Sequence, residues 1–107
     1  MRRQLGDDDE IVADAIKMFL VHHSAQVEAL TSALVVRDFD GLARAAHAVK
    51  GTVGNFAATE VAEGARELEE ACKAGDLAAI RSRVLSVVRS VDQLADALRE
   101  YQTRMER

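Results

Sequence analysis

The sequence predicts an all-α protein, an antiparallel four-helix bundle, and three observations support this. Proline is absent and aromatic residues make up only 4% of the chain, which argues against a turn-rich β fold. Alanine, leucine, glutamate and arginine, which favour helices, are abundant. Apolar residues also recur every three or four positions in four separate segments, and each apolar stripe must be buried against another. A bundle of four helices buries all four stripes.

Length, charge and cysteine content limit the class of protein. A chain of 107 residues forms one domain. Its formal net charge of -4 disfavours nucleic-acid binding. The single cysteine, Cys72, excludes an internal disulfide and a multi-cysteine metal site. No apolar run reaches the roughly 18 residues of a membrane span, and the acidic start does not fit a signal peptide. We therefore expect a cytoplasmic monomer that binds neither nucleic acid nor a membrane.

The first helix is predicted to run from Ile11 to about Arg37, at the start of a single domain over residues 11–107. Residues 1–10 are polar, and we expect them to form a flexible N-terminus. The carboxylates of Asp7–Asp9 favour a helix start, and the pattern also admits a short leading helix over Ile11–Ala15. The apolar stripe of the long helix consists of Ile16, Leu20, Val27, Leu30 and Leu34.

The second and third helices have clear start and stop signals. Asp38 or Asp40 would cap the start of the second helix, and Thr59 that of the third. The third helix ends at Gly75, and Asp76 then caps the last helix. The expected buried residues are Leu42, Ala46, Val49, Val53 and Phe56 in the second helix, and Val61, Ala65, Leu68 and Cys72 in the third.

The last helix has the longest apolar repeat. If it is continuous, it is roughly 40 Å long. Short connections between all four helices favour antiparallel neighbours. The repeat consists of Leu77, Ile80, Val84, Val87, Val91, Leu94, Leu98, Tyr101 and Met105.

The segment Ala45–Phe56, on the second helix, holds the candidate chemistry. His47 falls roughly 140° from the centre of the buried stripe, Gly51 about 180° and Gly54 about 120°. Lys50 lies nearer the flank of the stripe, one turn beyond His47. The imidazole is therefore expected to project toward solvent, with a cation beside it and glycines on the same face.

Each of these residues taken alone is typical of an ordinary surface, but the combination indicates a site. Two glycines within a helix cost roughly 1 kcal/mol each relative to alanine, although this chain uses alanine freely. A bare backbone lets a macromolecule or a bulky anion approach the imidazole. Neutral imidazole is a good nucleophile, and the lysine ammonium suits phosphoryl oxygens.

The other candidate residues favour structural roles. His23 lies on the buried stripe of the first helix and is expected to be a satisfied core or boundary histidine, while His22 is exposed. Adjacent histidines diverge by about 100° on a helix, so they are poorly placed to share a metal, and we expect no metal site. Cys72 lies on a core stripe as an inert thiol. The acidic run Glu67, Glu69 and Glu70 is expected to be a solvated face.

Histidine followed by lysine three residues on and by glycine four and seven residues on resembles the signature of histidine-containing phosphotransfer (HPt) domains. The resemblance covers roughly residues 11–100. One departure is Ala57, where the family often has glycine in the turn after this helix. The flanking residues that also match are Phe19-Leu20, Leu30, Ala33-Leu34, Asp38, Leu42 and Ala45-Ala46 before the histidine, and Leu68-Glu69, Ala71-Cys72 and Ala74-Gly75-Asp76-Leu77 after it.

This resemblance implies a phosphoryl carrier in a multistep two-component phosphorelay. His47 would carry the phosphoryl group, on its outer ring nitrogen, between aspartates in receiver domains of a hybrid sensor histidine kinase and of response regulators. Lys50 would stabilise charge on the transferred oxygens, and Gly51 and Gly54 would leave space for the docking receiver. The family has no ATP site, so autonomous kinase activity is not expected, and magnesium would belong to the receiver.

Two alternatives stay open at this stage. The first is a non-catalytic helical-bundle interaction module that only binds a signalling partner. The intact His47, Lys50 and Gly51 argue against it. The second is a metal-binding bundle, and the spacing of its candidate ligands counts against that reading.

Overall fold

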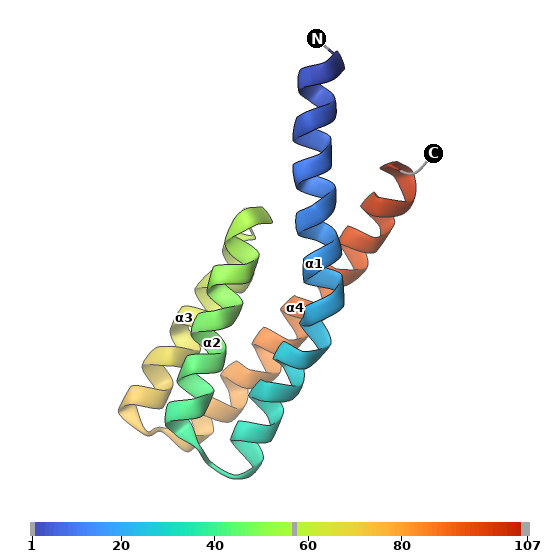
Figure 1. Ribbon diagram of the computed structural model, residues 1–107. Helices are drawn as coiled ribbons and strands as arrows, with labels where there is room; N and C mark the ends of the chain where they lie inside the picture. Colours follow the sequence, from blue (N-terminus) through green and yellow to red (C-terminus); the bar gives the residue numbers. More distant parts are fainter. Residues whose placement is uncertain (1, 57, 106–107) are drawn as a thin grey trace.

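Each of the four segments with an apolar stripe forms a helix in a computed structural model of the chain (Figure 1). The structure describes residues 2–56 and 58–105, and the side chains of residues 10–54, 56 and 58–104. No strand occurs in this described part of the chain, which confirms the predicted all-α class. The elements are α1 (Arg2–Val35), α2 (Phe39–Val53), the 3-10 turn η1 (Gly54–Phe56), α3 (Thr59–Ala74) and α4 (Leu77–Met105).

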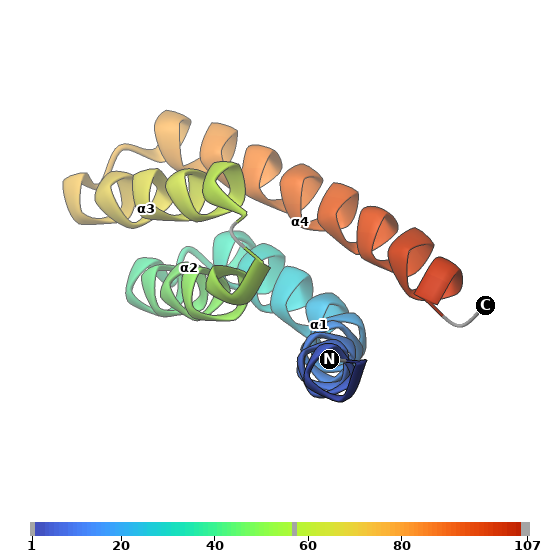
Figure 2. The same ribbon diagram turned by 90° about the horizontal axis from the view of Figure 1, so that it is seen from above.

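The helices pack as a closed ring of antiparallel neighbours. α2 contacts α1 and α3, and α4 closes the ring by contacting α3 and α1. From above, the pair α1 and α2 lies against the pair α3 and α4 (Figure 2). Short connections place consecutive helices side by side, which confirms the predicted four-helix bundle. Within the described residues, no helix combines the length and apolar character that a membrane crossing requires.

α1 is longer than predicted. It begins at Arg2 instead of Ile11 and is unbroken through residues 11–15, so the separate leading helix is a wrong expectation. Residues Asp7–Asp9 lie within the helix and do not mark its start. No proline precedes Ile11 to end the helix. The one glycine in this stretch, Gly6, lowers helix stability by only about 1 kcal/mol. The expected flexibility of residues 1–10 stays a prediction.

The buried faces of α2 and α3 agree with the predicted stripes except at Phe56, which lies in η1 after the end of α2 and is only partly buried. Both helices are strongly amphipathic, so their periodicity identifies the buried residues correctly. In α4 the core also includes Ala95, whereas Leu94 and Leu98 are partly buried and Tyr101 is exposed. The buried residues are Leu42, Ala46, Val49 and Val53 in α2, Val61, Ala65, Leu68 and Cys72 in α3, and Ile80, Val84, Val87, Val91 and Ala95 in α4.

The buried face of α1 is shifted from the predicted stripe toward Phe19, and the predicted Leu20, Val27 and Leu34 are only partly buried. Phe19 and His23 are buried together with the predicted Ile16 and Leu30. The His23 ring stacks on Phe19 with centroids 5.6 Å apart, and its Nδ1 lies 3.1 Å from the carbonyl oxygen of Leu20. His23 is therefore the satisfied core histidine that the sequence predicted. His22 is exposed, also as predicted.

Capping residues fix where the helices begin. The Gly41 N–H donates to Asp38 Oδ1 at 2.9 Å, and the Ala79 N–H donates to Asp76 Oδ1 at 3.2 Å, so Asp38 and Asp76 are N-caps. Gly75, with φ 71°, ends α3 in the left-handed conformation.

The predicted N-cap of α3 is wrong by one residue. Ala58 occupies that position, without a side-chain cap, because the backbone of Thr59 is already helical. Ala57, the departure from the family pattern, lies outside the described residues.

Candidate functional site

α2 holds His47 on the face opposite its buried stripe. The four buried residues of α2 are fully enclosed by the other helices, whereas the His47 side chain is 74% exposed. Asp38 caps the helix and Val49 and Val53 anchor its inner face, so the outward direction of His47 follows from the packing of α2. The structure thus places His47 where the periodicity predicted it.

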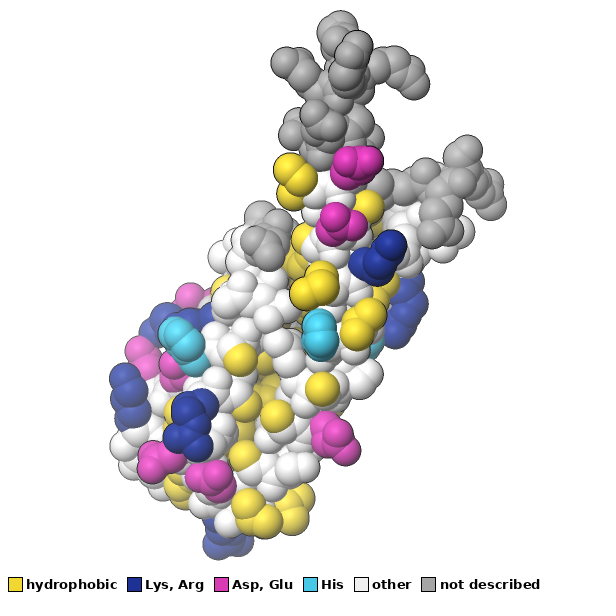
Figure 3. Space-filling view, in the orientation of Figure 1, with side chains coloured by type: hydrophobic (Ala, Val, Ile, Leu, Met, Phe, Trp, Pro, Cys, Tyr) yellow, Lys and Arg dark blue, Asp and Glu magenta, His cyan; other side chains and the backbone are white. Residues whose placement is uncertain are grey.

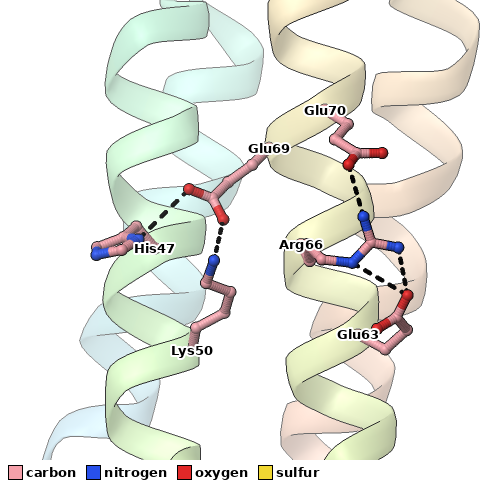
Figure 4. Close-up of polar contacts among 6 residues, drawn as sticks. All are labelled: His47, Lys50, Glu63, Arg66, Glu69 and Glu70. Carbon is pink, nitrogen blue, oxygen red and sulfur yellow. Dashed lines mark hydrogen bonds and ion pairs between the residues drawn. The ribbon is translucent and has the colours of Figure 1, made fainter.

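A carboxylate from α3 joins His47 and Lys50 into one polar cluster. Glu69 Oε2 lies 3.4 Å from His47 Nδ1, and Glu69 Oε1 lies 2.7 Å from Lys50 Nζ (Figure 4). The Glu69 side chain is 19% exposed and that of Lys50 31% exposed, so both lie at the boundary between the core and solvent. α2 and α3 pack against each other, and this contact brings the three residues together.

The cluster sets the charge state of Glu69. The hydrogen bond from Lys50 is the main cause that holds the pKa of Glu69 below its ordinary value. Burial acts in the opposite direction, and the charges of Lys50 and His47 add to the lowering. Glu69 is therefore an anion at neutral pH. An anionic oxygen beside Nδ1 stabilises a proton on that nitrogen, which leaves the lone pair on Nε2.

The sequence did not predict that Glu69 belongs to this cluster. Glu67, Glu69 and Glu70 were all expected on a solvated face, and this is correct only for Glu67 and Glu70. Glu67 pairs with Arg83, and Glu70 pairs with Arg66, both near the surface. Glu69 follows the buried Leu68 by one residue, which places it on the flank of the stripe. That boundary position was the available signal. Periodicity within one helix does not show which neighbouring helix such a flank faces.

The two glycines leave the outer face of the site without side chains. A Cβ atom added at Gly51 or Gly54 would meet no other group within 4 Å. Gly51 lies inside α2 as predicted. Gly54 instead caps the end of α2 and begins η1, with φ -56° and ψ -28°, and its N–H donates to the carbonyl of Lys50. The prediction that both glycines lie within the helix is therefore wrong for Gly54, although its backbone conformation is still right-handed helical.

Thr52, between these glycines, ties α2 to α1. The amide of Gln26 donates to Thr52 Oγ1 at 2.8 Å, and that hydroxyl donates to the carbonyl of Ala48 at 3.0 Å. The bond across the two helices fixes the end of α2 that carries the glycines.

A hollow opens beside the imidazole. It has a volume of about 480 Å³ and is lined by Ala43, Arg44, His47, Ala48 and Glu69. Charged side chains of both signs gather over α2 and α3 (Figure 3).

Among the side chains that the structure describes, no three His, Cys, Asp or Glu residues are grouped closely enough to hold a metal ion. Cys72 is buried, and burial raises the pKa of its thiol, as expected for an inert core residue.

Comparison with known proteins identifies a family for this chain. The family model of the Hpt domain matches residues 14–103, which is most of the chain and includes all three residues of the cluster. No curated protein and no solved structure matches the chain.

Proposed function

The chain belongs to the Hpt domain family, and we propose that it carries a phosphoryl group on His47 in a multistep phosphorelay. The family serves histidine phosphotransfer in phosphorelays, and its partners are receiver domains. The observation that supports His47 as the carrier is its contact with Glu69: Nδ1 faces the carboxylate, and the exposed side chain leaves Nε2 free for a partner. We propose that these receiver domains belong to a hybrid sensor kinase and to a response regulator, and that the chain is located in the cytoplasm.

In the proposed step, the lone pair of His47 Nε2 attacks the phosphorus of an aspartyl phosphate in a receiver. The bond between phosphorus and the aspartate oxygen breaks, and the carboxylate leaves with the electron pair. His47 keeps its Nδ1 proton, so the ring becomes a phosphoimidazolium whose positive charge faces Glu69. Attack on this group by the aspartate of a second receiver reverses the step and restores neutral imidazole.

The remaining residues of the site have supporting roles. Lys50 Nζ, 2.7 Å from Glu69, holds the carboxylate that orients the ring, and its charge stabilises the oxygens of the phosphoryl group in transfer. Gly51 and Gly54 present bare backbone, so a receiver can approach the imidazole closely. Neither an ATP site nor a resident metal belongs to this proposal, and magnesium forms part of the receiver's own site.

The test is transfer from a phosphorylated receiver to the wild-type chain and to His47→Gln. Wild type should gain a phosphate that is labile in acid and stable in base, and His47→Gln should gain none while its helicity and melting temperature stay unchanged. His22→Gln is the matched control, because His22 is also an exposed helical histidine. Labelling that persists in His47→Gln, or that disappears in His22→Gln, would contradict the assignment. Receiver binding without any phosphate transfer would instead support the non-catalytic interaction module.

A further inference from the structure

We propose that Arg44 is a second phosphoryl-binding cation, which pairs with the phosphoryl group while it resides on His47. This inference rests on the proposed function and extends it to a residue outside the Hpt-type motif of His47, Lys50 and the glycines. Three features of the structure carry it: the position of Arg44 on α2, the charges already present in the cluster, and the hollow beside the imidazole.

Arg44 lies one turn before His47, on the same face of α2. Side chains on a helix tilt toward its N-terminus, so His47 leans over the turn that carries Arg44 and away from the turn of Lys50. Arg44 and His47 both line the hollow of about 480 Å³, and two of the other lining residues are alanines. The small side chains of Ala43 and Ala48 leave room there for a phosphoryl group between the guanidinium and the imidazole.

The charges of the cluster require a further cation in the phosphorylated state. Lys50 is already paired with Glu69, with 2.7 Å between Nζ and Oε1, so it can compensate only part of any added negative charge. A phosphoryl group adds a charge of about -1.5 to -2 to the cluster, and the phosphoimidazolium ring offsets only one unit of it. The phosphoryl group would be on Nε2, across the ring from the Nδ1 that lies 3.4 Å from Glu69 Oε2, so the pair of Lys50 and Glu69 is on the other side of the imidazole. Without another positive group, the phosphorylated site would carry uncompensated negative charge.

Arg44 is available to supply that positive charge. None of the ion pairs between described residues involves Arg44, whereas Arg66, Arg83, Arg99 and Arg104 are each paired with a carboxylate. The guanidinium is always charged, and its planar fork can bind two phosphoryl oxygens at once. Lys50 offers only a point charge, which its contact with Glu69 holds toward α3.

The experiment is a phosphorus NMR titration of phosphorylated His47. Wild type, Arg44→Gln, Arg44→Lys and a control, Arg89→Gln, are labelled with phosphoramidate and titrated between pH 5 and 9. A nearby cation favours the dianionic phosphoryl group, so its loss should raise the pKa of the second ionisation. A unit charge about 5 Å away in water corresponds to a shift of about 0.5 pH unit. Arg89 is an exposed arginine on α4 without an ion pair among the described residues, so its loss should change nothing.

We expect Arg44→Gln to raise the pKa by about 0.5 pH unit, Arg44→Lys to keep most of the wild-type value and Arg89→Gln to match wild type. Arg44→Gln should also shift the equilibrium of phosphoryl transfer several-fold toward a receiver, because its phosphorylated His47 is less stabilised, with an unchanged circular dichroism spectrum. A titration of Arg44→Gln that superimposes on wild type would overturn this inference while leaving His47 as the carrier. A wild-type chain that no phosphodonor labels on His47 would overturn the proposed function itself.

Discussion

Replacing Glu69 by glutamine tests whether a carboxylate from α3 prepares His47 for attack. The amide has nearly the same shape but no charge, so it weakens the hold on the Nδ1 proton and breaks the ion pair with Lys50. In wild type, we expect the neutral imidazole to carry its proton on Nδ1. In Glu69→Gln, the population with the proton on Nε2 should increase, and this form cannot attack through Nε2.

The geometry limits the size of this effect. The contact between Nδ1 and Oε2 is 3.4 Å long and the imidazole is 74% exposed, so water screens the interaction. Such an exposed contact contributes at most about 1 kcal/mol, which corresponds to about a fivefold change in the ratio of the two tautomers. Transfer from a receiver should slow by a similar factor of about two to five, because only the Nδ1-protonated form attacks.

Nitrogen NMR of histidine-labelled protein, at a pH where the imidazoles are neutral, measures the tautomer ratio directly. The buried His23, with its Nδ1 on the Leu20 carbonyl, provides an internal reference that should not change. Glu70→Gln is the matched control, because Glu70 is the next residue on α3 and pairs with Arg66 instead. The reasoning is refuted if Glu69→Gln leaves both the tautomer ratio and the transfer rate of wild type intact, or if Glu70→Gln changes them equally.

Two further predictions concern the glycine face and acid stability. Gly54→Leu should be at least as stable as wild type, by up to about 1 kcal/mol, because its backbone is right-handed and its Cβ meets nothing within 4 Å. Phosphoramidate should still label its His47, while transfer from a receiver should fall at least tenfold; a clear loss of stability or normal receiver transfer would contradict this. The pKa of Glu69 is lowered in the folded state, mainly by Lys50, so its contribution to stability is present above its ordinary value of 4.5 and is lost as the pH falls through the lower folded value. Urea unfolding from pH 7 to pH 3 should therefore show a stability difference between wild type and Glu69→Gln that shrinks below pH 4.5; a constant difference would be inconsistent with the ion pair.

Periodicity predicts the parts of this fold in which one helix face decides burial. α2 and α3 each have one narrow apolar stripe, and the buried residues agree with it apart from Phe56, which follows α2 in η1. α1 is less regular: its buried face is shifted toward Phe19, while the predicted Leu20, Val27 and Leu34 are only partly buried. Its start at Arg2 was missed because the carboxylates before Ile11 are compatible both with a helix start and with a helix interior.

The candidate site was predictable only as far as it lies on one helix. The outward position of His47 and the open face at Gly51 follow from the stripe of α2. Glu69 comes from α3, and its contact with His47 and Lys50 depends on how the two helices are rotated against each other. A single sequence carries no direct record of that rotation, so the residue that orients the imidazole could be found only in three dimensions.

If His47 is the carrier, its exposure has a consequence for how long the phosphoryl group can stay on the chain. An imidazole that is 74% exposed can be reached by a docking protein, but water has the same access. A phosphoryl group there would persist because its own hydrolysis is slow, since none of the described residues covers the exposed imidazole. Transfer to a receiver then competes with hydrolysis. The yield of the relay depends on how often a receiver binds within the lifetime of the phosphorus–nitrogen bond. Abundance of the receiver would thus set the fidelity of the signal as much as the chemistry of the carrier does.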